Sequence, residues 1–162
     1  ATPVSIDDVI TGEILSGTTR SVIAAVWNLI VCLSLTPWLH MVSSPWALAI
    51  VPLAVLPGLL FAALSICFAS IARAMSQFSY FFSLVVNPMF WFSGAFFPFD
   101  TLPKWARILG WFVPLSHATE LYRGLLHGDL ERGMIADIAW LAIGSAFFYW
   151  LALIGMRKRL IE

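Results

Sequence analysis

Residues 88–105 read PMFWFSGAFFPFDTLPKW, and this stretch decides where an apolar helix has to stop. Its aromatic run is interrupted at Ser93 and Gly94 and again at Pro98, and a polar stretch begins at Asp100. A proline inside a helix removes one backbone hydrogen bond and clashes with the preceding turn. The stretch therefore predicts that a helix arriving from the N-terminal side breaks near Pro98 and that a short new helix starts after Asp100.

The composition of the 162-residue chain indicates its class. Hydrophobic residues make up 60% of the chain and charged residues 11%, whereas about 25% of the residues of a soluble domain are charged. So few charges cannot cover a soluble globule, and we predict an integral membrane protein. The formal net charge of zero gives no indication of nucleic-acid binding. The chain does not begin with Met, no stretch of it resembles a signal peptide, and we expect its N-terminal part to be missing.

Four segments are apolar over the roughly 20 residues that a membrane-spanning helix needs. They are residues 21–39, 46–71, 78 to about 91 or 97, and 135–156. Prolines inside such segments are tolerated where neighbouring helices satisfy the freed carbonyl groups. We therefore expect an all-α, polytopic membrane helix bundle with four transmembrane helices, a cytoplasmic amphipathic helix and an outer re-entrant helical pair.

Basic residues predict the orientation of the bundle, because Lys and Arg are enriched in short cytoplasmic loops and near span ends. Arg157, Lys158 and Arg159 follow the last predicted span, which places the C-terminal end in the cytoplasm. Four spans then return the N-terminal end of this chain to the cytoplasm. The turn at residues 40–45 and the segment 98–134 are expected on the outer side.

The N-terminal stretch PVSIDDVITGEILSG, residues 3–17, has the pattern of a short amphipathic helix. Ser5 is a good N-cap with Asp8 three residues later, and Asp7 and Asp8 favour the helix start through its dipole. Gly17 is able to end the helix. Its acidic character does not suit binding to anionic lipid, which favours basic helices. A docking helix for a cytoplasmic partner and a plain juxtamembrane helix both remain open.

Two short helices are predicted on the outer side, between Pro98 and Gly128. Asp100 or Thr101 caps the first helix, Pro114 ends it, and Gly128 ends the second. Each helix is too short to span a bilayer and too apolar to lie in water. We therefore expect a re-entrant pair, whose turns are buried in protein or line a wet cavity.

His117, Glu120 and Arg123 follow one another on the second of these helices. One His–Glu pair without a second pair is a weak metal signal, so we expect a solvated or ion-paired helix face and no metal site. The chain has no HExxH, GxSxG, Walker or CxxC motif. No catalytic residue is therefore predicted, although a membrane-embedded enzyme that uses His117 and Glu120 is an alternative.

Two stretches of the sequence resemble a known family. FWFSGAFFPFDTLPKWARILGWFVPLSHATELYRGLLHG, residues 90–128, resembles the C-terminal signature of ABC-2 type transporter permeases. TPVSIDDVITGEIL, residues 2–15, resembles the segment between the second and third spans of that family. Within the family, the chain is most similar to the lipo-oligosaccharide exporter permeases of the nodulation type.

The resemblance implies a single membrane domain over residues 1–162 that holds only the third to sixth of six spans and lacks the N-terminal third. It divides the chain into a cytoplasmic coupling helix (1–17), the first three spans present (18–97), outer re-entrant helices (98–133), and the last span with a cytoplasmic tail (134–162). The family works as a permease dimer with two ATPase subunits. The coupling helix would contact the ATPase, and the re-entrant helices would cap the exit path.

The function implied is export of a lipo-oligosaccharide, glycolipid or polysaccharide across the bacterial inner membrane. A drug or haem exporter of the same architecture is an alternative. The implied partners are an ABC ATPase, which would use ATP and Mg, a second permease copy and membrane lipids. This chain would bind no cofactor and would not itself be an enzyme. The predicted ATPase-docking residues are Ser5, Asp7, Asp8, Gly12 and Glu13, and the predicted outer-gate or substrate-path residues are Phe92, Gly94, Phe97, Pro98, Asp100, Pro103, Pro114, His117, Glu120 and Arg123.

Overall fold

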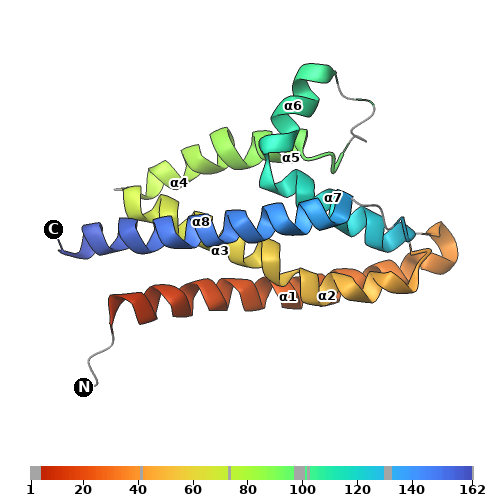
Figure 1. Ribbon diagram of the computed structural model, residues 1–162, viewed down its shortest axis with the longest axis horizontal. Coiled ribbons are helices and arrows are strands. Elements are labelled where there is room, and N and C mark those ends of the chain that lie inside the picture. Colours follow the sequence, from red (N-terminus) through yellow and green to blue (C-terminus); the bar gives the residue numbers. More distant parts are fainter. Residues whose placement is uncertain are drawn as a thin grey trace.

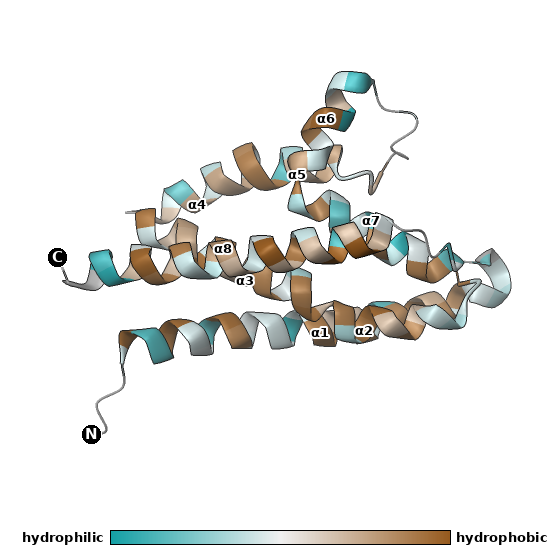
Figure 2. Ribbon diagram, in the orientation of Figure 1, coloured by the Kyte–Doolittle hydropathy of each residue, from teal (hydrophilic) through white to brown (hydrophobic). Residues whose placement is uncertain are grey.

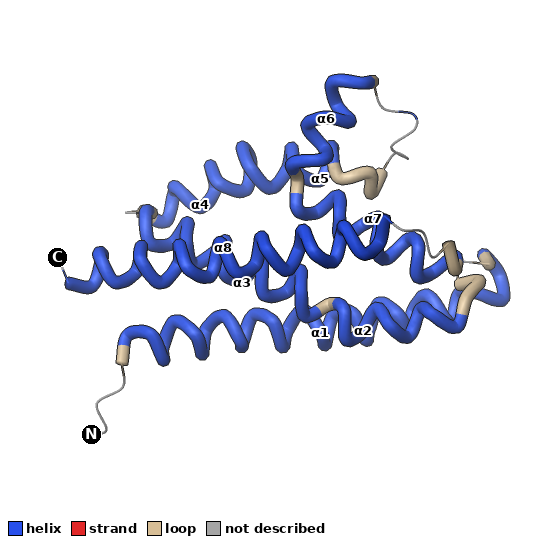
Figure 3. The backbone as a smooth tube through the Cα atoms, viewed as in Figure 1, coloured by secondary structure: helices blue, strands red, loops and turns tan. Residues whose placement is uncertain are grey.

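A computed structural model describes residues 5–40, 42–72, 74–96, 101, 103–129 and 133–161 (Figure 1). This described part consists of helices and short connections and contains no strand (Figure 3). Three of its helical segments are long and apolar enough to cross a membrane, at Ile6–Trp38, Pro45–Ile71 and Gly133–Arg159. The prediction of an all-α membrane helix bundle is confirmed.

Helix α1 (Ile6–Leu39) is one continuous helix of 34 residues. Ser5 caps its start, as predicted, but the helix does not end at Gly17, so the prediction of a separate N-terminal amphipathic helix is wrong. Gly17 lies where α1 crosses its neighbour, because a Cβ built on Gly17 would lie 2.9 Å from the Cβ of Ala62. The glycine therefore allows two helices to approach closely and is not a helix stop.

The second span is built from three pieces in series, η1 (Pro45–Ala49), α2 (Ile50–Leu53) and α3 (Val55–Ile71). The Ser44 side chain accepts the backbone N–H of Trp46 and so caps the first piece. Helical hydrogen bonds run through the junction at Ala54, whose N–H donates to Ile50 and whose carbonyl accepts from Gly58. The span predicted at 46–71 is confirmed.

The predicted third span corresponds to α4 (Met75–Phe81), the π-helical turn η2 (Phe82–Val86) and α5 (Asn87–Phe92). It is not among the three segments that are long and apolar enough to span. The widened turn has a local cause, since Pro88 lacks the N–H that would continue the α-helical ladder. The Asn87 N–H instead reaches back to the Phe82 carbonyl. Length and composition therefore support three of the four spans predicted.

Two short helices, α6 (Lys104–Phe112) and α7 (Pro114–His127), precede the last helix α8 (Gly133–Ile161). The predicted short pair is confirmed, and Gly128 ends α7 in the left-handed conformation at φ 84°. The predicted cap of the first helix is wrong for Thr101, because Pro103 occupies the N-cap position of α6. Asp100, the other predicted cap, lies outside the described residues.

Helix α3 lies at the centre of the bundle, between α1 and α8. Small residues make these contacts close, since Cβ atoms built on Gly58 and Gly155 would lie 2.9 Å from the Ser21 Cβ and 2.4 Å from the Ser70 Oγ, respectively. Interfaces of small residues are typical of helix packing in membranes. Figure 2 shows hydrophobic residues along most of α3 and α8, with hydrophilic residues at the C-terminal end of α8.

Both ends of the described chain lie at one end of the bundle, on the left in Figure 1. The C-terminal end of α1, the beginning of η1 and the C-terminal end of α7 lie at the opposite end. There the Ser43 N–H donates to the Leu126 carbonyl at 2.9 Å. This arrangement agrees with the prediction that the two ends of the chain share one side.

Candidate functional site

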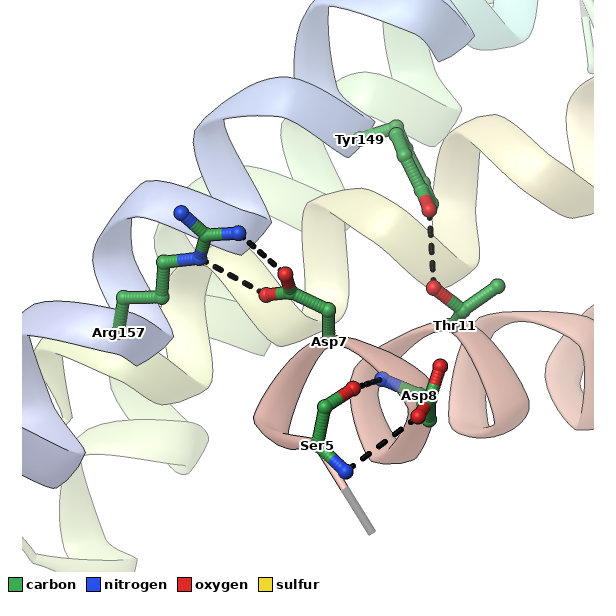
Figure 4. Close-up of polar contacts among 6 residues, drawn as sticks. All are labelled: Ser5, Asp7, Asp8, Thr11, Tyr149 and Arg157. Atoms are coloured by element: carbon green, nitrogen blue, oxygen red, sulfur yellow. Dashed lines mark hydrogen bonds and ion pairs between the residues drawn. The ribbon is translucent and has the colours of Figure 1, made fainter.

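The first candidate region is the start of α1, called here the acidic end and defined by Ser5, Asp7, Asp8, Gly12 and Glu13. Ser5 and Asp8 form a reciprocal capping box (Figure 4). The Ser5 Oγ accepts the Asp8 N–H at 3.2 Å, and the Asp8 Oδ2 accepts the Ser5 N–H at 3.3 Å. Two backbone donors that the helix leaves unpaired are thereby satisfied. The two predicted docking residues Ser5 and Asp8 therefore stabilise the helix start.

Helix α8 holds the acidic end in place. The Arg157 Nε donates to the Asp7 Oδ1 at 2.8 Å, and its Nη2 donates to the second carboxylate oxygen (Figure 4). One turn further along α1, the hydroxyl groups of Thr11 and Tyr149 lie 2.9 Å apart. Paired Arg–carboxylate bonds of this kind fix orientation as well as charge. The predicted docking residue Asp7 is thus engaged with the last span.

Gly12 and Glu13 are both exposed on the same two turns of α1. A Cβ built on Gly12 would have no neighbouring atom within 4 Å, so open space lies over this turn. The acidic end therefore combines an anchored side, which faces α8, with an accessible acidic side that includes Glu13.

The second candidate region surrounds His117, which α7 places against α8 and the end of α6. The His117 Nδ1 lies 2.7 Å from the Asp137 Oδ1, and its Nε2 lies 2.8 Å from the Trp111 carbonyl oxygen. The imidazole stacks on Trp140 with ring centroids 4.6 Å apart and an interplanar angle of 22°. The side chain is almost buried, with 8% of His117 exposed.

The partners of His117 determine its hydrogen-bonding role. A carbonyl oxygen only accepts, so Nε2 carries a proton and donates to Trp111. Nδ1 faces a carboxyl group, and a hydrogen bond there requires one further proton shared between His117 and Asp137. The pair is therefore neutral overall, whichever of the two groups holds that proton. Such a pair can lie within a bundle without an uncompensated charge.

Helix α7 also holds the end of α5 and the turn that follows it. The Arg123 Nη2 donates to the Gly94 carbonyl at 2.8 Å, and the Ser116 Oγ donates to the Phe92 carbonyl at 3.3 Å. Gly94 takes a φ of 74°, which only glycine adopts readily. Helix α5 therefore ends at Phe92, before the turn at Ser93 and Gly94 and earlier than the break predicted near Pro98, and Arg123 fastens this turn to α7.

The structure brings some of the predicted outer-gate residues together around α7. The others are exposed or lie outside the described residues. Phe92, Gly94, Pro114, His117 and Arg123 lie on or against α7, as just described. Glu120 is exposed on α7, and Pro103 is exposed at the start of α6. Phe97, Pro98 and Asp100 lie outside the described residues.

Two cavities flank the His117 cluster. The first, called here the polar-lined cavity because its lining includes Arg107, Glu120 and the His117–Asp137 pair, has a volume of about 560 Å³ and is bounded by α6, α7 and α8. The apolar cavity has a volume of about 800 Å³ and lies between α5, α6 and α8. Trp140 lines both. The polar-lined cavity is formed by Arg107, Ile108, Trp111, Ser116, His117, Glu120, Gly133, Ala136, Asp137 and Trp140.

Sequence reasoning missed Asp137, Trp140 and Arg157 as members of these regions. One available signal was overlooked, because Asp137 is an acidic residue inside the predicted last span. An ionisable residue in a span is rare and usually faces a partner or a functional cavity. The pairing of Arg157 with Asp7 had no local signal, since 150 residues separate the two.

Comparison with known proteins gives a family match. The sequence model described as ABC-2 type transporter matches residues 1–127. Nodulation protein J of Rhizobium leguminosarum bv. trifolii is 28% identical over 163 aligned residues, which cover 99% of this chain and 60% of that protein. The protein of the same name from Bradyrhizobium diazoefficiens is 31% identical over 150 residues, which cover 91% of this chain and 53% of that protein.

The corresponding protein of Rhizobium meliloti is 29% identical over 162 residues, 99% of this chain and 60% of the relative. The chain therefore spans between 53% and 60% of the length of these relatives. No solved structure matches it.

Proposed function

Because the chain belongs to the ABC-2 type transporter family, we propose that it is part of the membrane-embedded permease subunit of an ATP-driven exporter. The family is one of transport subunits, and the three long apolar helices fit a multi-pass membrane protein. The observation that carries the proposal is the family match over residues 1–127, which includes the acidic end and most of the outer helices.

The proposed partner at the acidic end is a soluble ABC ATPase, which would hydrolyse ATP with Mg. An exposed acidic turn at Gly12 and Glu13, next to an anchored turn at Asp7, suits contact with a basic protein surface. Electrostatic complementarity of this kind gives specificity and speeds association. The proposal assigns this end to the cytoplasmic side of the inner membrane, in agreement with the basic residues Arg157, Lys158 and Arg159.

Helix α8 links the acidic end to the outer helices. It carries Arg157, which binds Asp7, and Asp137, which binds His117. At a rise of roughly 1.5 Å per residue, these two contacts are about 30 Å apart. A rigid helix fastened at both ends would transmit a displacement of the acidic end to the outer helices.

The proposed substrate is a lipo-oligosaccharide, or a related glycolipid or polysaccharide. The similarity to proteins named Nodulation protein J and the aromatic lining of the outer cavities support this class. A drug or haem exporter would share the same helices. Genes for sugar-modifying enzymes beside this one would favour a glycolipid, whereas resistance or cytochrome-assembly genes would favour the alternatives.

A second permease copy is proposed to complete the translocation path. Large hydrophobic residues on α1 are exposed along its length, including Ile23, Trp27 and Ile30. Lipid or a second copy would cover this face in a membrane.

The test is co-purification of the full-length protein with a Walker-motif ATPase produced from the neighbouring gene. We expect the two subunits to elute together from a sizing column in mild detergent and the complex to hydrolyse ATP. Separate elution of two folded subunits at micromolar concentration would contradict the proposal.

A further inference from the structure

We infer that the polar-lined cavity and the apolar cavity form one binding site for a single amphiphile, with a saccharide head in the first and an acyl chain in the second. The inference deepens the proposed function and depends on it for the direction of transport. It rests on the face of α8 that lines both cavities, on the charge balance of the first cavity and on the apolar lining of the second.

The two cavities share a wall on α8. The α8 residues that line the polar-lined cavity are Gly133, Ala136, Asp137 and Trp140, and those that line the apolar cavity are Trp140, Ile143, Gly144, Phe147 and Phe148. These positions follow the i, i+3, i+4, i+7 spacing of a single helix face. One face of α8 therefore lines both cavities, and Trp140 is the residue that the two linings share.

Helix α6 also lines both cavities, with different residues facing each one. Ile108 and Trp111 face the polar-lined cavity, whereas Leu109 and Phe112 face the apolar one. A ligand that extends along α8 past Trp140 would therefore contact α6 along both of its sides. From Asp137 to Phe148 this path measures about 16 Å.

The lining of the first cavity suits a polar head that is uncharged. The charged side chains in the lining are of both signs, with Arg107 and Glu120 opposite in charge and the His117–Asp137 pair neutral overall. A lipid head with a net negative charge would require an excess of positive charge, which this lining does not supply. Saccharide hydroxyl groups both donate and accept, so they match a mixed lining of this kind.

Two indole rings give this cavity flat surfaces as well. Trp111 has 57% of its surface exposed, and Trp140 lines the cavity while its ring stacks on His117. Aromatic side chains combine a large apolar contact area with a polar N–H, which suits the alternating apolar and polar faces of a sugar ring. Only the Oδ1 of Asp137 faces His117, and the second oxygen of this carboxyl group is a further acceptor beside the two rings.

The second cavity suits an acyl chain. All of its lining side chains are apolar or aromatic, and among them are Leu84, Val85, Met89, Phe92 and Phe147. Its volume of about 800 Å³ lies within the usual range for ligand sites, about 300–1,000 Å³. Met89 has a flexible side chain that can adapt to the shape of an acyl chain.

The experiment measures binding of tritiated dodecyl maltoside to the full-length protein in lipid nanodiscs, with empty nanodiscs subtracted. Dodecylphosphocholine has the same chain without a sugar, and free maltose has a sugar without the chain. We expect saturable binding of dodecyl maltoside, with dodecylphosphocholine and maltose each competing at least about tenfold more weakly.

Three variants locate the ligand. Trp111→Leu keeps the backbone carbonyl that accepts from His117, and we expect about fivefold weaker binding from the loss of one aromatic contact. Ile143→Trp fills the apolar cavity from a position that is 70% exposed, and we expect roughly tenfold weaker binding. Trp150→Leu, an exposed tryptophan on α8 that lines neither cavity, is the control and should leave binding unchanged.

The outcomes separate this inference from the proposed function. Equal competition by dodecylphosphocholine would overturn the saccharide head, and unchanged binding in Trp111→Leu or Ile143→Trp would overturn the assigned location. Absence of saturable binding in a protein that still captures its ATPase would overturn the site alone. Binding as expected without ATPase capture would support the site and count against the exporter.

Discussion

The His117 side chain on α7 has contacts on three of its sides. Its ring contacts Asp137, the Trp111 carbonyl and the face of Trp140. Removing the ring leaves the largely buried carboxyl group of Asp137 and the Trp111 carbonyl oxygen without the partner that they have in the structure. Unsatisfied groups of this kind cost more than the bond itself contributes.

We expect His117→Ala to lower the free energy of unfolding by about 2–4 kcal/mol. Thermal unfolding of the purified full-length protein in detergent measures this as a lower Tm. His127→Ala, an exposed histidine at the end of the same helix, is the matched control and should leave the Tm nearly unchanged. Equal Tm values for both variants and the parent would contradict the assigned contacts.

The sequence predicted only part of the surroundings of His117. The sequence placed His117, Glu120 and Arg123 on one helix and predicted an ion-paired or solvated face. Arg123 does bind the chain itself, through the Gly94 carbonyl. The partner of His117, however, comes from α8, and its identity depends on how α7 docks there. No spacing along α7 encodes that docking.

Local sequence signals predicted the start of helix α1 but not its end. The capping box of Ser5 and Asp8 lies within four residues, so it was predictable. The end of the helix was not, because Gly17 serves a contact with Ala62 on α3. A glycine that allows close packing and one that ends a helix look alike in sequence.

The α1–α3 contact predicts a difference between two glycine substitutions. Gly58→Ala would bring a methyl group to 2.9 Å from the Ser21 Cβ and 3.3 Å from the Thr18 Cα, and we expect a loss of about 1–3 kcal/mol in unfolding free energy. Gly12→Ala has no atom within 4 Å and should raise stability by up to about 1 kcal/mol through helix propensity. Thermal unfolding of both variants is the measurement, and a lower Tm for Gly12→Ala than for Gly58→Ala would refute the packing.

The acidic end predicts an effect on partner binding that does not involve the fold. Glu13 is exposed and lies outside both the capping box and the Asp7–Arg157 pair. Glu13→Lys should therefore weaken ATPase capture by at least about fivefold and leave the Tm unchanged. Surface plasmon resonance with the immobilised ATPase gives the affinity. Asp129→Lys, an exposed acid at the other end of the bundle, is the control, and an equal loss in both variants would argue against docking at Glu13.

At the scale of the whole molecule, the fold class followed from composition, because a chain with 11% charged residues cannot form a soluble globule. The number of spans was harder to predict than the fold class. The predicted third span is not among the segments that length and composition support, because the polar residue Asn87 interrupts its apolar run and Gln77 directly precedes it. The two ends of the described chain nevertheless lie at one end of the bundle, as an even number of spans predicts.

This arrangement predicts opposite exposure for the two ends of the bundle. In a background without Cys32 and Cys67, Glu13→Cys should react with a membrane-impermeant maleimide only from the cytoplasmic face of sealed vesicles. Asp129→Cys should react only from the other face, because it follows α7 at the opposite end of the bundle. Labelling of both positions from one face would contradict the proposed topology.

The central claim, that this chain belongs to the membrane subunit of an exporter for glycolipid-like substrates, is tested most directly by ATP-dependent lipid movement. The full-length protein would be reconstituted with its ATPase in proteoliposomes that contain an NBD-labelled glycosylceramide, with the ATPase on the outside. Dithionite then measures the fraction of label that remains in the outer leaflet. We predict that ATP moves the labelled lipid to the protected inner leaflet and that a non-hydrolysable analogue does not. An outer-leaflet fraction that is the same with ATP and with the analogue, in liposomes whose ATPase is bound and active, would contradict the claim.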